Sequence, residues 1–328
     1  MRSFIVAMLF IAMLAPAQAL TLKISTEYPD GNFVLKELRQ AGDDVEKRTD
    51  GRIRFKFYPG GVMGNAAAVL RKIRIGQLHG AFIQSGALAN LNPDSQVLNA
   101  PLLFRNFEEV DIVRAQLDSE IEKGYQQSGW HTFGLVEGGF AYAMTNKPAT
   151  NLSVLREQKI WLPANDPLSE KIASTFKINP IVLNISDVLT ALQTGAIDAI
   201  VAPPVGAIAL QWHSKLGYLT DAPFMYTYGI VAVSEKALRK VSVEDLQILT
   251  EEFTAASQSI DQQARRDNLD AFDALQQLGI EVVNLSSQAR NSIELEAQGA
   301  TQELIRSGEF GSEIYQHVVD VLSEYRNE

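Results

Sequence analysis

Apolar and polar residues follow two regular spacings along most of this chain. Alternation over 22–26 and 52–58 predicts strands with one face in water, and apolar residues at helical spacing over 33–47 and 108–125 predict helices. Short apolar runs predict further strands at 132–136, 140–144, 159–162, 229–233 and 280–283. Helical spacing predicts further helices at 167–176, 289–305 and 312–325. Because strands and helices alternate, we expect an α/β fold with a mainly parallel sheet.

One unit of this pattern occurs twice, from Val69 to Gln84 and from Ser186 to Pro204, about 120 residues apart. In both copies an amphipathic helix leads through a glycine into a short apolar strand. Gly195 can adopt the left-handed conformation that ends a helix, and Pro203 stops the following strand. The repeat predicts two similar lobes. The alternative is that an α/β protein repeats helix, glycine and strand by chance.

The longest helical pattern covers 244–278 and contains no proline or glycine before Gly279. At about 1.5 Å per residue such a helix exceeds 50 Å, whereas a lobe of about 150 residues has a radius of gyration near 15 Å. Either the pattern breaks into two helices around 264–268, or one helix runs across both lobes. We favour the second interpretation.

The first 19 residues have the layout of a cleaved secretory signal, with one basic residue, Arg2, an apolar run, and Ala17-Gln18-Ala19 at its end. We expect cleavage before Leu20 and a periplasmic protein; an uncleaved membrane anchor is the alternative. The remaining chain has 28 basic and 39 acidic residues, which argues against nucleic acid as a partner. It has no cysteine, so disulfides and thiolate chemistry are excluded.

The sequence offers no catalytic or metal-binding constellation. The four histidines are scattered, and His79 is expected to be structural because the second copy of the repeat has Asp198 there. Neither a Gly-x-Ser-x-Gly elbow nor a phosphate-binding glycine loop is present. We therefore expect a protein that is not an enzyme and that uses no cofactor or metal.

Binding residues are easier to place, because ligands of parallel α/β sheets lie beyond the carboxyl ends of the strands. The loops 27–32, 60–65 and 84–86 should share one rim of an interlobe cleft. Aromatic and polar residues near predicted strand ends are candidates to line it, although aromatic residues are often simply core. The candidates are Glu27, Tyr28, Asn65, Gln84, Phe140, Tyr142, Trp161, Pro163, Ala202, Tyr226 and Tyr228.

The chain resembles the solute-binding proteins of tripartite ATP-independent periplasmic (TRAP) transporters over essentially its whole length after residue 19. The motifs that carry the resemblance are Phe57-Tyr-Pro-Gly-Gly-Val-Met-Gly64, Ile73-x-x-Gly-Gln-Leu-His-Gly80, Ala100-Pro-Leu-Leu-Phe104, the approach from Asn151 to Trp161, and Ala191-Leu-Gln-Thr-Gly-Ala-Ile-Asp198.

The resemblance implies a two-lobe periplasmic-binding-protein fold (type II-like) with mixed sheets, crossing strands as a hinge and a long helix spanning both lobes. We expect lobe I at 20–137 plus 227–266 and lobe II at 138–226 plus 267–328. It further implies a protein that closes around one small molecule and delivers it to a small and a large integral membrane subunit. We expect the protein to be a monomer.

The sequence departs from the family pattern where relatives bind a carboxylate. Trp161 stands where relatives commonly have an arginine, and Ala141 and Ala202 stand at two other polar ligand positions. An indole cannot form the bidentate pair that a guanidinium makes. The ligand is then neutral, aromatic or cationic and stacks on Trp161, which we favour, or it is a carboxylate bound through backbone amides and a cation such as Lys147 or Arg105.

Two other uses of the fold remain open at this point. A ligand-loaded protein of this kind could dock on a sensor instead of a transporter, and a secreted enzyme could be built on the same two-lobe plan.

Overall fold

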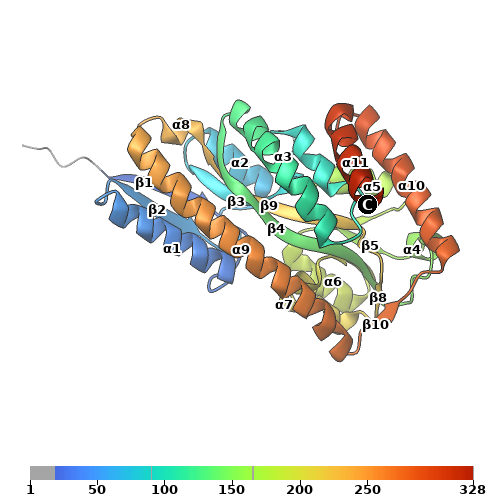
Figure 1. Cartoon of the computed structure of the whole chain (residues 1–328). Coiled ribbons are helices and arrows are strands. Elements are labelled where there is room, and N and C mark those ends of the chain that lie inside the picture. Colours follow the sequence, from blue (N-terminus) through green and yellow to red (C-terminus); the bar gives the residue numbers. More distant parts are fainter. Residues whose placement is uncertain (1–18, 90, 165, 328) are drawn as a thin grey trace, which may run out of the picture.

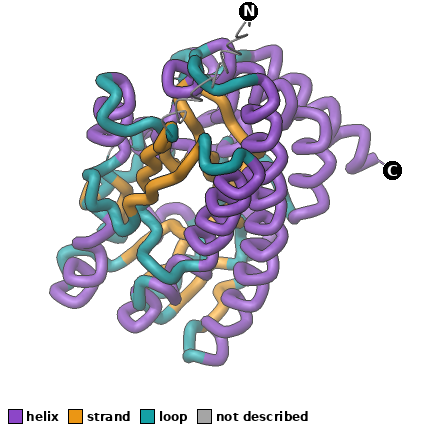
Figure 2. The backbone as a smooth tube through the Cα atoms, turned by 90° about the vertical axis from the view of Figure 1, so that its left-hand side faces the viewer, coloured by secondary structure: helices purple, strands orange, loops and turns teal. Residues whose placement is uncertain are grey.

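A computed structural model describes residues 19–89, 91–164 and 166–327, so residues 1–18 of the predicted signal peptide lie outside the described residues. The strands form one mixed sheet in the order β2-β1-β3-β9-β4-β7-β5-β6. Two groups of strands lie one above the other in Figure 2, with long helices along one side. The predicted α/β class and mixed sheet are confirmed. Within the described residues, no helix is both long enough and apolar enough to cross a membrane.

Lobe I is built on three parallel strands that place their carboxyl ends at one edge. They are β1 (Leu20–Ser25), β2 (Ile53–Tyr58) and β3 (Gly80–Gln84). The connecting helices are α1 (Phe33–Arg48) and α2 (Ala66–Arg74). Each begins at an asparagine whose side chain accepts a backbone N–H: Asn32 from Val34 and Asn65 from Ala68. Such caps satisfy helix donors that otherwise have no partner.

Two antiparallel strands carry the sheet from one lobe to the other. These are β4 (Trp130–Thr145), preceded by α3 (Phe107–Gln127), and β9 (Met225–Ser234). The prediction of two separate strands at 132–136 and 140–144 is wrong, because both belong to β4. Its register with β9 shifts near Gly134 and Gly139, which have φ of +97° and +90°. Glycine tolerates this conformation, so the strand bends without ending.

Lobe II repeats the parallel arrangement with β5 (Ile160–Pro163), β6 (Ile181–Leu183) and β7 (Ala199–Ala202). Its helices are α4 (Leu152–Arg156), α5 (Pro167–Thr175), α6 (Val188–Thr194) and α7 (Pro204–Ala209). Two short parallel strands, β8 (Tyr218–Thr220) and β10 (Glu281–Val283), join it through β4. The predicted helix end is confirmed, since Gly195 caps α6 with φ +71°.

The sequence repeat has the same hydrogen-bond pattern in both lobes. His79 lies just before β3. Its ring nitrogen Nδ1 accepts the Lys23 backbone N–H at 2.9 Å, and its backbone N–H donates to the Lys23 carbonyl at 2.9 Å. Asp198 lies just before β7 and makes the same two bonds with Lys159, at 2.6 Å and 3.1 Å. The residue before the strand therefore aligns it with its parallel neighbour, which supports the structural role predicted for His79.

The predicted long helix is continuous. After the short α8 (Glu235–Leu238), α9 (Val243–Gln277) contains 35 residues and is about 52 Å long. It runs diagonally along both groups of strands (Figure 1) and ends beside β10. The interpretation that one helix spans both lobes is therefore confirmed. Two further helices, α10 (Ser287–Arg306) and α11 (Ser312–Asn327), complete the chain.

Candidate ligand-binding site

The carboxyl ends of the lobe I strands lead into loops that are bonded to one another. The Gly60 N–H donates to the Tyr28 carbonyl at 2.8 Å, and the Gly61 N–H donates to the Thr26 carbonyl at 3.1 Å. These bonds join the loop after β1 to the loop after β2. These two loops therefore lie side by side, as the prediction of a shared rim requires.

Three of the predicted site residues lie together on this rim. Tyr28 packs edge-on against Phe82 with ring centroids 5.2 Å apart. Burial raises the pKa of the Tyr28 hydroxyl, a hydrogen bond with the Gln84 side chain opposes the shift, and the charge of Glu27 adds to it. Glu27 is itself reached by solvent, yet desolvation raises its pKa. The fourth residue predicted here, Asn65, is the cap of α2.

On lobe II, the surface that faces lobe I is formed where β5, β6 and β7 end. Tyr142 on β4 pairs in register with Ala202, the last residue of β7, and its ring packs against Phe272 of α9 at 5.3 Å. Burial, followed by the charge of Asp221, raises the pKa of the Tyr142 hydroxyl to about 12. Pro163 ends β5 and is half-buried.

Trp161 lies deeper than the ligand-stacking hypothesis requires. Its side chain is 3% exposed and packs edge-on against Trp212 with ring centroids 5.1 Å apart. The indole Nε1–H donates to the Leu183 carbonyl, at the end of β6, at 3.0 Å. The position therefore supports the wall of lobe II, and direct contact between Trp161 and a ligand stays a prediction.

The other aromatic candidates are in the core. Phe140, Tyr226 and Tyr228 are at most 3% exposed. The Tyr228 hydroxyl donates to the Ser95 carbonyl at 2.7 Å, and the Tyr226 hydroxyl accepts from Arg114 at 3.2 Å. The hydroxyls of the two tyrosines thus already have protein partners, and contact of the three residues with a ligand stays a prediction.

The two lobes touch where the loop after β3 meets the start of α5. Gly86 lies against Asp166: a Cβ atom added to Gly86 would be only 2.7 Å from Asp166 Oδ1. Asp166 caps α5, accepting the Ser169 N–H at 3.1 Å and its hydroxyl at 2.7 Å. Burial raises the Asp166 pKa despite these bonds. Gly86 belongs to the loop 84–86 that the sequence predicted on the rim, whereas Asp166 was not predicted, although Asp166-Pro167 is a recognisable helix start.

The two cations considered as arginine substitutes lie at different places. Thr145 of β4 pairs with Ala199 at the start of β7, so Lys147 lies at the edge of the sheet opposite to the carboxyl ends. This location argues against Lys147 as a ligand-binding cation. Arg105 lies before α3, where its backbone N–H donates to Glu109 and its side chain is exposed.

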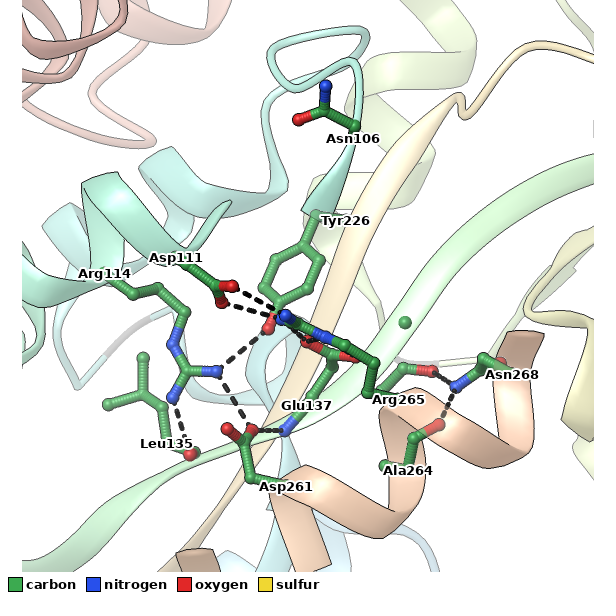
Figure 3. A network of polar contacts seen from close by, with 12 residues as sticks. Asn106, Asp111, Arg114, Leu135, Glu137, Tyr226, Asp261, Ala264, Arg265 and Asn268 are labelled. Atoms are coloured by element: carbon green, nitrogen blue, oxygen red, sulfur yellow. Dashed lines mark hydrogen bonds and ion pairs between the residues drawn. The ribbon is translucent and has the colours of Figure 1, made fainter. Parts of the chain in front are cut away.

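A network of charged groups joins α3, β4 and α9 where these elements cross between the lobes (Figure 3). Arg265 of α9 binds Glu137 of β4 and Asp111 of α3, each through two or more hydrogen bonds. Next to it, Arg114 binds Asp261 at 3.0 Å and the Leu135 carbonyl at 2.9 Å. The network gives the crossing region a rigid polar framework, and no sequence motif pointed to it.

The sequence model of the bacterial extracellular solute-binding protein family 7 matches residues 24–307. The chain belongs to this family. It is an extracytoplasmic solute-binding protein of the TRAP type, and its family and fold are those of binding proteins, not of enzymes. Proteins of this type bind small molecules and work with membrane subunits.

Similar proteins cover most of this family 7 chain. A 2,3-diketo-L-gulonate-binding periplasmic protein of Escherichia coli is 24% identical over 288 residues, 84% of this chain and 86% of the relative. A sialic acid-binding periplasmic protein of Vibrio cholerae is 22% identical over 236 residues, 70% of this chain and 72% of the relative.

Two solved TRAP-type structures have the same fold. A Haemophilus influenzae TRAP periplasmic solute-binding protein with bound L-gulonate has a TM-score of 0.82, 19% identity, and coverage of 92% of this chain and 99% of its own. A Bordetella pertussis extracytoplasmic solute receptor binding pyroglutamic acid has a TM-score of 0.82, 20% identity and the same coverage. At these identities the likeness shows the fold alone.

Proposed function

We propose that this protein, after removal of its first 19 residues, captures one small organic solute in the periplasm and delivers it to the small and large membrane subunits of a TRAP transporter. Its lobes, 20–137 plus 227–266 and 138–226 plus 267–328, would close around the solute. We propose that it acts as a monomer. The observation that carries this proposal is the contact of Gly86 with Asp166, which brings the carboxyl-end loops of the two lobes together.

The site would lie between Glu27, Tyr28 and Gln84 of lobe I and Tyr142, Ala202 and Asp166 of lobe II. Relatives and structural neighbours bind acids such as L-gulonate and pyroglutamic acid. We propose that this chain does not bind its solute through the arginine–carboxylate pair that relatives commonly use. Trp161 stands at the strand position of the usual arginine, and its N–H already has a partner in Leu183. A ligand carboxylate would therefore lack its bidentate cation at this position.

The test is native mass spectrometry of the chain 20–328, purified from the periplasm without refolding. We expect one small molecule per protein chain. Removal of the solute by mild unfolding and refolding should increase the radius of gyration measured by small-angle X-ray scattering, and adding it back should restore the compact form. A protein that carries no solute, and whose scattering is unchanged by a periplasmic metabolite extract, would contradict the proposal.

A further inference from the structure

Behind the carboxyl end of β3, a cluster of polar side chains is almost completely buried. Ser85, Ser95, Gln96 and Asn99 are each at most 3% exposed. Ser85 begins the short 3₁₀ helix η1 (Ser85–Leu88), and the other three belong to the 3₁₀ helix η2 (Pro93–Asn99). Buried polar groups are costly unless they are hydrogen-bonded, so their bonds show what this cluster holds in place.

Two of these side chains hold Ser85 through both of its oxygen atoms. Gln96 Nε2 donates to the Ser85 carbonyl at 2.9 Å, and the Ser85 hydroxyl donates to Asn99 Oδ1 at 2.9 Å. The pairing of β3 with β9 extends only as far as Gln84. The position of Ser85 is therefore fixed by side chains of η2 and not by strand pairing.

Ser85 lies between two residues that face the boundary of the lobes. On one side of it, the Gln84 side chain is hydrogen-bonded to the Tyr28 hydroxyl. On the other side, Gly86 lies against Asp166, and η1 contacts α5 of lobe II. A shift of Ser85 would therefore move the point at which the two lobes touch.

The same cluster is bound to β9, one of the two strands that join the lobes. Asn99 Nδ2 donates to the Tyr226 carbonyl at 2.8 Å, beside the bend of β4. The Ser95 carbonyl, also in η2, accepts the Tyr228 hydroxyl at 2.7 Å. Two hydrogen bonds through Asn99 thus connect Ser85 at the rim of lobe I to the strand that crosses into lobe II.

The amide of Gln96 contributes more than the filling of space. In the described part of the chain, Gln96 Oε1 is buried without a hydrogen-bond partner, which costs free energy. A methionine of similar size would fill the same volume without this cost. The amide offsets it through the two bonds that Nε2 donates, to the Ser85 carbonyl and the Ser95 hydroxyl. The position of Ser85 is therefore what this amide secures.

We propose that Gln96 and Asn99 are positioning residues of the solute site. They hold the Ser85–Gly86 segment where lobe II meets it, and they thereby set the affinity for the solute from behind the rim. Without either amide the segment can shift, and part of the binding free energy is then used to order it again. This inference rests on the proposed solute-binding function.

Isothermal titration calorimetry on chain 20–328 tests the inference. The titrants are L-gulonate, pyroglutamate and the solute released from the wild-type protein. Gln96→Met and Asn99→Leu keep the size of each side chain and remove its amide, and Ser85→Ala is a smaller change that removes only the bond to Asn99. The matched control is Thr49→Val. The Thr49 side chain is 0% exposed and forms hydrogen bonds with Val45 and Ile53 at the amino end of β2.

We expect Gln96→Met and Asn99→Leu to raise the Kd at least tenfold and Ser85→Ala at least fivefold. Thr49→Val should change the Kd less than threefold, although urea unfolding should show that it also loses stability. The double variant Ser85→Ala/Asn99→Leu should bind no more weakly than Asn99→Leu alone, because both changes remove the same bond.

A Kd that is unchanged in the folded variants of Gln96, Asn99 and Ser85 would overturn the inference and leave the interlobe site intact. The same conclusion would follow if Thr49→Val weakened binding as much as they do, because the Kd would then follow stability alone. Wild-type protein that carries no solute and binds neither acid would contradict the proposed function itself, and the inference would fall with it.

Discussion

Arg265 and Glu137 form a multidentate ion pair at the point where α9 crosses β4. The Glu137 side chain is 0% exposed, and Arg265 approaches it with Nη2–Oε2 at 2.5 Å and Nε–Oε1 at 3.2 Å. The same guanidinium holds Asp111 of α3 at 2.7 Å and 2.8 Å (Figure 3). One side chain thus connects three elements in the region that joins the lobes.

Replacing Arg265 by alanine should destabilise the protein by about 3 kcal/mol, because Glu137 would remain buried without its partner. Urea unfolding would measure this change. The matched control is Arg266→Ala, which removes an adjacent exposed arginine whose side chain donates to Gln263. The double variant Arg265→Ala/Glu137→Gln should be more stable than Arg265→Ala alone, because it no longer buries an unpaired charge. Equal stability of the two single variants would contradict the role assigned to the pair.

Gly139→Ala should cost more stability than Gly134→Ala. Both glycines have positive φ, so alanine strains both by about 1 kcal/mol or more. At Gly139 the new Cβ would also lie 2.5 Å from Asn268 Nδ2, which donates to the Gly138 and Ala264 carbonyls. At Gly134 its nearest contact, Ser257 Cβ, is 3.7 Å away. Thermal unfolding of the two variants separates the steric clash with Asn268 from the strain of an alanine at positive φ. Equal decreases in melting temperature would show that Asn268 moves aside at no cost.

Gly86→Ala should weaken solute binding without lowering the stability of the unliganded protein. Its Cβ would press on Asp166 only when the lobes are in contact, and 1.4 kcal/mol against closure corresponds to about tenfold in Kd. Gly206→Ala is a suitable control, because no atom lies within 4 Å of its added Cβ and its φ is not positive. Titration calorimetry with the native solute provides the measurement. An unchanged Kd for Gly86→Ala would mean that the ligand-bound form does not use this contact.

Trp161→Phe tests whether the indole reaches the ligand. The change removes the Nε1–H bond to the Leu183 carbonyl and part of the ring, so it should destabilise the protein by about 1–3 kcal/mol. Trp212→Phe reduces the other ring of the same pair and serves as the reference. A Kd that rises more than tenfold only for Trp161→Phe would place Trp161 at the ligand. Similar affinities in both folded variants would leave it as part of the core.

Asp166→Asn should raise the melting temperature at pH 7. Burial raises the Asp166 pKa in the folded protein above its unfolded value near 3.8, so the folded state binds the proton more tightly. The wild type therefore loses stability as pH rises from about 3.8 through the raised folded pKa, and the asparagine variant does not. We expect a difference on the order of a few °C at pH 7 that vanishes below about pH 3.8. Differential scanning calorimetry from pH 3.5 to 8 measures it; a variant less stable at pH 7 would argue that the Asp166 charge is stabilising.

Much of the fold could be predicted from the sequence because the decisive signals are local. Hydrophobic spacing over 244–278 favoured one continuous helix over two shorter ones, and a helix of that length would extend past a single lobe. The repeat of helix, glycine and strand identified both lobes, and His79 and Asp198 make equivalent bonds in them. The same local signals separated β4 into two strands, because Gly138 and Gly139 look like a break when their partner strand is unknown.

The candidate site depended on contacts between residues far apart in the chain. The rim of lobe I could be predicted from the sequence, because the carboxyl-end loops follow from the order of the strands. Sequence alone could not show that Trp161 packs on Trp212, that Asp166 meets Gly86, or that Arg265 is committed to Glu137. Burial and charge pairing depend on which distant segments meet, and only the tertiary packing of the two lobes decides that.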